Sequence, residues 1–89
     1  MVEKDFVIKS ESGLQAKTAA VFIQKASAYK STIWVEKDER KANAKSLLGL
    51  LSLGIQNGTG IRVIAEGEDE AEALQGLEEF LAAVDRDGN

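Results

Sequence analysis

The chain has 89 residues and a formal net charge of −4, and it contains neither cysteine nor histidine. This composition predicts a single domain of residues 1–89 without disulfides, thiolate metal sites or histidine chemistry, and its acidic balance argues against direct nucleic-acid binding. No stretch approaches the roughly 20 apolar residues of a membrane span, and the charged start lacks the hydrophobic run of a signal peptide, so we expect a cytoplasmic protein.

Secondary-structure signals follow one another along the whole chain. Strands are indicated by β-branched and aromatic runs, and helices by apolar residues spaced three and four apart. Gly13 supplies turn freedom before the first helix, whose start we expect Ser12 or a neighbouring backbone group to satisfy. Residues 85–89 are expected to fray. The predicted order is strand 2–8, helix 15–29, strand 32–37, polar turn 38–40, strand 41–44, a short helix from Ser46, loop 56–60, strand 61–65 and a helix from residue 68.

The order β-α-β-β-α-β-α predicts an α+β fold, in which three helices cover one face of a four-stranded antiparallel sheet and the other face is open to solvent. Val7, Trp34 and Ile64 fall on the open face, and Trp34 should be at least partly exposed. An exposed indole there is either ordinary cross-strand packing or part of a self-association surface. The residues expected toward the helices are Phe6, Ile8, Ile33, Val35, Ile61 and Val63, with a stripe of Ala73, Leu74, Leu77, Phe80, Leu81 and Val84 on the last helix.

The short helix from Ser46 carries more leucine than one buried face can use. Ser46 is a favourable N-cap, and its position also suits a phosphate, because free N–H groups and the positive end of the helix dipole converge there. At about 100° per residue, Leu50 and Leu53 lie on one side of this helix together with Gly49. A second group lies roughly opposite, next to Ser46, and consists of Leu47, Leu48 and Leu51.

Two interpretations of this second group remain open. If Gly49, Leu50 and Leu53 face the core, the second group is left largely in water and forms a docking surface. The alternative is a helix that is buried on both sides. A chain of 89 residues has little material to cover both sides, which favours the docking surface.

Two segments together resemble the phosphocarrier protein HPr family of the sugar phosphotransferase system. They are G-L-Q-A-K-T-A at 13–19 and N-A-K-S-L-L-G-L-L-S-L-G at 43–54, and the resemblance extends over essentially the whole chain, including G-E-D-E at 67–70. It implies an open-faced β-sandwich with sheet order 1-4-2-3. It also implies a phosphoryl-carrying histidine in the first motif, at the position where this chain has Gln15.

Gln15 indicates which branch of the family the chain resembles. A glutamine amide cannot take and release phosphate, and the sequence contains no histidine that could replace it, which excludes phosphorelay from enzyme I. Glutamine at this position is a hallmark of Crh-like members, the catabolite-repression homologues of HPr, which retain a regulatory serine matched by Ser46. The resemblance implies that HPr kinase/phosphorylase phosphorylates Ser46, and that the phosphorylated form binds catabolite control protein A. That LacI-type regulator, and not this chain, would bind DNA.

The expected partner surface departs from the family pattern at several positions. Lys17 and Thr18 stand where members commonly have arginine and proline, and lysine lacks the planar fork that grips a carboxylate bidentately. Leucines replace frequent methionines in the short helix, which predicts a narrower partner range. The residues expected to contact partners around Ser46 are Gln15, Lys17, Ala20, Leu47, Leu48 and Leu51.

Other classes of function fit the sequence less well. An acyl carrier protein would need aspartate where Lys45 stands and an all-helical fold. No acid–base pair or nucleophile–base constellation is visible, so we expect neither catalytic residues nor a cofactor, and Glu68–Glu72 is better explained as a solvated helix start than as a metal site. The remaining alternative is an interaction module that binds a metabolic enzyme or the kinase without a transcriptional role. An edge first strand also leaves room for a homodimer.

Overall fold

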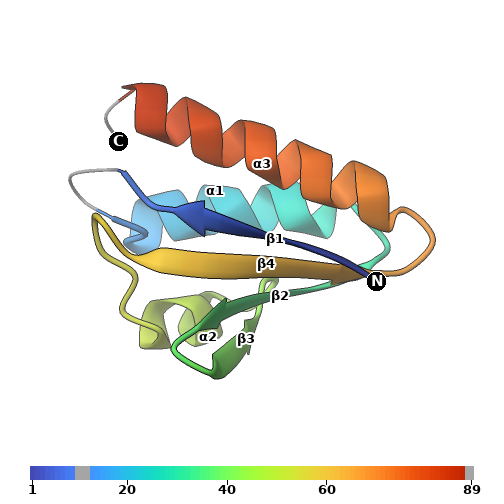
Figure 1. Cartoon of the computed structure of the whole chain (residues 1–89), viewed down its shortest axis with the longest axis horizontal. Helices are drawn as coiled ribbons and strands as arrows, with labels where there is room; N and C mark the ends of the chain where they lie inside the picture. The colour runs from blue at the N-terminus through green and yellow to red at the C-terminus, as the bar shows by residue number, and fades with distance from the viewer. Residues whose placement is uncertain (10–12, 88–89) are drawn as a thin grey trace.

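The computed structural model describes residues 1–9 and 13–87. Within these ranges the sheet is antiparallel with strand order β1-β4-β2-β3, which confirms the expected fold (Figure 1). Ser12, expected near the start of the first helix, lies outside the described residues. The elements are β1 Val2–Val7, α1 Ala16–Ser27, β2 Thr32–Lys37, β3 Arg40–Asn43, α2 Leu47–Ser52, β4 Gly60–Glu66 and α3 Glu70–Asp87.

The described helices share one side of the sheet, where the core lies. Helix α3 packs on β1 and β4, α2 packs beside β3, and α1 contacts both of the other helices (Figure 1). Fully buried side chains from all these layers meet there, among them Phe22 of α1, Leu50 of α2 and Leu77 of α3. Alternation along the strands supplies the opposing apolar surface, as expected. Of the predicted inward residues, Ile8, Ile33, Val35, Ile61 and Val63 are buried, and Phe6 packs against the core while partly exposed.

The open face of the sheet is only partly exposed to solvent. Val7 at the end of edge strand β1 is exposed, and Trp34 is half-buried, with the Lys41 ammonium 5.4 Å from its ring centre. Ile64 is buried although it faces away from the helices, because Glu3 and Trp34 flank it on the neighbouring strands. Trp34 therefore takes part in cross-strand packing, while its side chain stays partly exposed as predicted.

Several element boundaries differ from the expectation. Asp38 and Glu39 both have positive φ, 51° and 70°, so two residues suffice for the hairpin turn and Arg40 already belongs to β3. Helix α3 continues to Asp87, three residues into the segment 85–89 that is expected to fray. Between Gly76 and Gly88 the sequence has no glycine or proline that would end the helix earlier.

The acidic start of α3 has a structural role that the sequence did not indicate. The Asp69 carboxylate accepts hydrogen bonds from the backbone N–H groups of Lys30 and Ser31, both at 2.9 Å, and from the Ser31 hydroxyl. These hydrogen bonds hold the pKa of Asp69 below its usual value, and the bond from the Ser31 hydroxyl has the largest effect. The start of α3 is thereby attached to the connection between α1 and β2.

Candidate functional site

Ser46 caps α2 as predicted. Its backbone is extended, with φ −117° and ψ 115°, and its Oγ accepts a hydrogen bond from the Gly49 N–H at 3.2 Å. The Asn43 carbonyl accepts the Ser46 N–H at 3.0 Å, which fixes the residue from the preceding strand. Ser46 is half-buried, so its hydroxyl is held in a defined place and still borders solvent.

Lys45, directly before the cap, is occupied elsewhere. Its Nζ donates to the carbonyls of Tyr29 at 2.9 Å and Ser31 at 3.1 Å, at the end of α1. Its backbone N–H donates to the Asn43 side chain at 2.8 Å. A charge next to Ser46 in the sequence is therefore held by the α1–β2 connection. Sequence reasoning missed this, because no local pattern links Lys45 to residues some fifteen positions away.

Two cations from the β2–β3 hairpin stabilise the other end of α2. Lys37 Nζ donates to the carbonyls of Leu53 and Gly54, both at 3.0 Å. Arg40 donates to the carbonyls of Ser52 at 3.2 Å and Leu53 at 3.4 Å. The last carbonyls of a helix lack partners within the helix and carry its negative dipole end. These contacts supply the missing hydrogen bonds and place positive charge at that end. A six-residue helix is marginal alone. The Ser46 cap at its start and the contacts from the β2–β3 hairpin at its end hold α2 in place.

The leucines of α2 divide as the docking interpretation requires. Leu50 is fully buried and Leu53 is 3% exposed, whereas Leu48 is 80% exposed, so the interpretation with both sides buried is wrong. Gly49 lies on the side of α2 that faces β3, since a Cβ built there would lie 3.4 Å from the Ala42 Cβ, at van der Waals contact. The exposed group forms a surface that we call the leucine patch and that consists of Leu47, Leu48 and Leu51.

The start of α1 supplies the remaining predicted site residues. Gln15, Lys17 and Ala20 are all exposed, and α1 contacts α2. Gln15 precedes the helix in extended conformation and accepts the Ala19 N–H at 2.7 Å through its backbone carbonyl, while its side-chain amide makes no capping hydrogen bond within the described chain. The structure adds exposed Val21, which sequence reasoning passed over as an ordinary helix residue.

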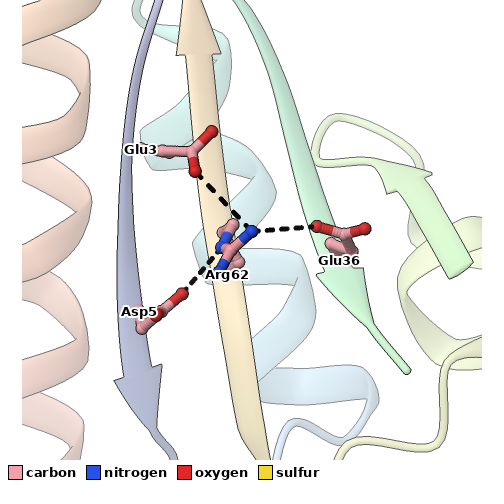
Figure 2. Close-up of polar contacts among 4 residues, drawn as sticks. All are labelled: Glu3, Asp5, Glu36 and Arg62. Atoms are coloured by element: carbon pink, nitrogen blue, oxygen red, sulfur yellow. Dashed lines mark hydrogen bonds and ion pairs between the residues drawn. The ribbon is translucent and has the colours of Figure 1, made fainter. Parts of the chain in front are cut away.

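A second polar cluster lies on the open face of the sheet, away from α2. Figure 2 shows Arg62 of β4 between carboxylates of both neighbouring strands: Asp5 at 2.8 Å, Glu3 at 3.6 Å and Glu36 at 4.0 Å. The hydrogen bond from Arg62 lowers the pKa of Asp5, and Asp5 in turn raises the pKa of Arg62. Arg62, Glu3 and Asp5 are exposed and Glu36 is half-buried, so the cluster contributes little stability.

Two other kinds of site are not found in the part of the chain that the structure describes. Among the side chains that the structure describes, no three acidic ones are placed to hold a metal ion together, including those of Glu68–Glu72. Among the described helices, none has the length and apolar character needed to cross a bilayer.

Comparison with known proteins finds similarity over nearly the whole chain. Residues 2–83 match the PTS-HPr family, the PTS HPr component phosphorylation site. The HPr-like protein Crh of Halalkalibacterium halodurans is 49% identical over 81 residues, which cover 91% of this chain and 96% of that protein.

Solved structures agree with this similarity. HPr-C-His from Thermoanaerobacter tengcongensis superposes with a TM-score of 0.92 at 44% identity, over 97% of both chains. Crh from Bacillus subtilis, an intertwined dimer formed by domain swapping, superposes with a TM-score of 0.76 at 43% identity, over 94% of this chain and 97% of that one.

Proposed function

The chain belongs to the HPr family, and from this premise we propose that it is a single-domain regulatory protein of the Crh type that acts in carbon catabolite repression. In this proposal HPr kinase/phosphorylase phosphorylates Ser46, and the phosphorylated protein binds catabolite control protein A as a corepressor. Relatives named HPr-like protein Crh support the regulatory role. The single observation that carries the proposal is the capped, solvent-bordering hydroxyl of Ser46 beside the leucine patch.

We propose that the protein does not carry phosphate on α1. The family's phosphoryl acceptor is matched by Gln15, whose amide nitrogen shares its lone pair with the carbonyl and is not a nucleophile. The chain contains no histidine that could replace it. The exposed start of α1 is then free to serve as a contact surface through Gln15, Lys17 and Ala20.

Phosphorylation would transfer the γ-phosphoryl group of ATP to Ser46 Oγ, with release of ADP and of the hydroxyl proton. The product carries about −1.5 to −2 charges at the start of α2. The helix dipole favours such charge by roughly 0.3–1 kcal/mol at an exposed site. We therefore expect the fold to persist and the phosphate to act as a contact.

The positions of the cations support this role for the phosphate. Lys45 is bound to carbonyls of Tyr29 and Ser31, while Lys37 and Arg40 are bound to carbonyls at the far end of α2. With these three cations engaged elsewhere, we expect an arginine or lysine of the partner to bind the phosphate in a charge-assisted contact, beside exposed Lys17. The leucine patch supplies apolar area beside it, and the phosphate supplies the switch.

Incubation with ATP and HPr kinase/phosphorylase tests the first step. Mass spectrometry should find one phosphate on the wild type, localised to Ser46, and none on Ser46→Ala. A second serine of α2, Ser52, is the matched control, and Ser52→Ala should be phosphorylated like the wild type. Phosphate on another residue, or none on the wild type, would contradict the proposal.

A second candidate rests on the exposure of the leucine patch without any modification. An interaction module for a metabolic enzyme or for the kinase itself would use the patch in the unmodified state. Pull-downs with and without phosphate on Ser46 separate the two candidates, because only the corepressor requires the phosphate. A homodimer is a further partner that we propose, supported by the dimer of Bacillus subtilis Crh.

A further inference from the structure

The loop between α2 and β4 forms a tight turn around Asn57 and Gly58. The Thr59 N–H donates to the Gln56 carbonyl at 3.0 Å, and the Gln56 N–H donates to the Thr59 hydroxyl at 3.0 Å. Gly58 has φ +87°, as the third position of a type II turn demands. Asn57 and Gly58 are both exposed, and a Cβ built on Gly58 would meet no atom within 4 Å. Water and base can therefore reach this dipeptide.

An asparagine followed by glycine can modify itself chemically. The backbone nitrogen of Gly58 attacks the Asn57 side-chain carbon, a C–N bond forms, and the side-chain nitrogen leaves as ammonia. Water then opens the resulting succinimide to aspartate or isoaspartate, a mass gain of about 1 Da. The attack requires that the Gly58 nitrogen lose its proton and approach the side chain.

Ile8, the residue directly after β1, holds that nitrogen. The Gly58 N–H donates to the Ile8 carbonyl at 2.6 Å, and the Ile8 N–H donates to the Thr59 carbonyl at 2.9 Å. An N–H engaged in this way reacts with base only after a local opening, as in amide hydrogen exchange. We propose that Asn57 is a latent deamidation site whose reaction is controlled by the docking of the end of β1 on the Gln56–Thr59 turn.

The modification would act on the neighbouring start of α1. The Leu14 N–H donates to the Ile55 carbonyl at 3.0 Å, so the segment before Gln15 rests on the residues that lead into the turn. Deamidation adds a negative charge to this loop, and the isoaspartate product also adds an atom to the backbone. A transient release of the end of β1 would thus lead to a permanent covalent change beside the segment that precedes α1.

Timed incubation at mildly alkaline pH tests the proposal, with peptide mass spectrometry at Asn57 and hydrogen exchange at Gly58. The folded wild type should deamidate at least about tenfold more slowly than the urea-unfolded chain, because opening of the folded state limits the reaction. Val7→Gly loosens the exposed end of β1 without removing core packing, and should accelerate both readouts by about two- to fivefold. The matched control Gln24→Gly weakens exposed α1 instead and should leave both rates unchanged.

Asn57→Ala should abolish the mass gain, which confirms the modified residue. Equal deamidation rates in the folded and unfolded wild type would overturn the proposal. Equal acceleration by Val7→Gly and Gln24→Gly would overturn it as well, because control would then lie in global unfolding.

Discussion

The starts of α1 and α2 can be compared almost residue for residue. Each helix is preceded by a polar residue with extended backbone, Gln15 or Ser46, and each borders solvent. Ser46 caps its helix through its side-chain oxygen, whereas Gln15 contributes only its backbone carbonyl. Both starts thus share an extended backbone, and their side chains differ: the Ser46 hydroxyl is the phosphate acceptor that we propose, whereas the Gln15 amide is not a nucleophile.

Replacing Gln15 by histidine should give the largest change, from no phosphoryl transfer to measurable transfer. An imidazole at the exposed start of α1 restores a nucleophile that can accept phosphate. Incubation with phosphorylated enzyme I and detection of acid-labile phosphate would measure it. Gln24→His, elsewhere on exposed α1, is the control and should stay unmodified. Transfer to the wild type would refute the loss of the carrier function. A Gln15→His variant that accepts no phosphate would show that features other than this side chain also prevent the transfer.

The two leucine groups of α2 should separate stability from binding. Leu50→Ala removes a fully buried side chain and should destabilise the fold by about 2–5 kcal/mol. Leu48→Ala should change stability by less than about 0.5 kcal/mol. We expect it to weaken binding of the phosphorylated form by about 5- to 30-fold, as truncation of an interface anchor does. Urea unfolding and a binding titration measure the two effects. A Leu48→Ala variant that binds normally would show that the leucine patch is not part of the binding surface.

Two substitutions of Ser46 should separate the cap from the phosphate. Ser46→Ala loses both and should destabilise the protein by about 1 kcal/mol. Ser46→Asn keeps a capping oxygen but offers no hydroxyl, so it should remain as stable as the wild type and never accept phosphate. Thermal unfolding beside the kinase assay measures both properties. Equal destabilisation by the two variants would show that the Gly49 N–H does not depend on a capping side chain.

The start of α3 provides the smallest test, because its acidic residue has only a structural role. The pKa of Asp69 is lowered from 3.8 in the folded state, first by the Ser31 hydroxyl and then by the Lys30 N–H. Its contribution to stability is therefore complete above that ordinary value and is lost as the pH falls through the lower folded-state value. Asp69→Asn should flatten this part of the acid unfolding curve, measured as urea midpoints across the acid range. Glu79→Gln on the exposed side of α3 is the control, and an unchanged curve for Asp69→Asn would contradict the assignment.

Short-range periodicity predicted the order of the elements and the composition of the α2 surface well, and the resemblance to the HPr family implied the order of strands in the sheet. Leu50 and Leu48 differ in exposure as a helical rotation predicts. Contacts between distant segments were not accessible in this way. The bonds from Lys45 to the end of α1, and from Asp69 to Ser31, join residues that only the folded chain brings together. Ile64 was placed on the correct face, but its burial depends on neighbours in two other strands.

The most direct test is a calorimetric titration of purified catabolite control protein A with this protein, phosphorylated at Ser46 and unphosphorylated, under the same buffer conditions. We expect only the phosphorylated form to bind, and Leu48→Ala to weaken this binding while the fold remains intact. Equal binding of the two forms would contradict it and would favour the interaction module that works without phosphate.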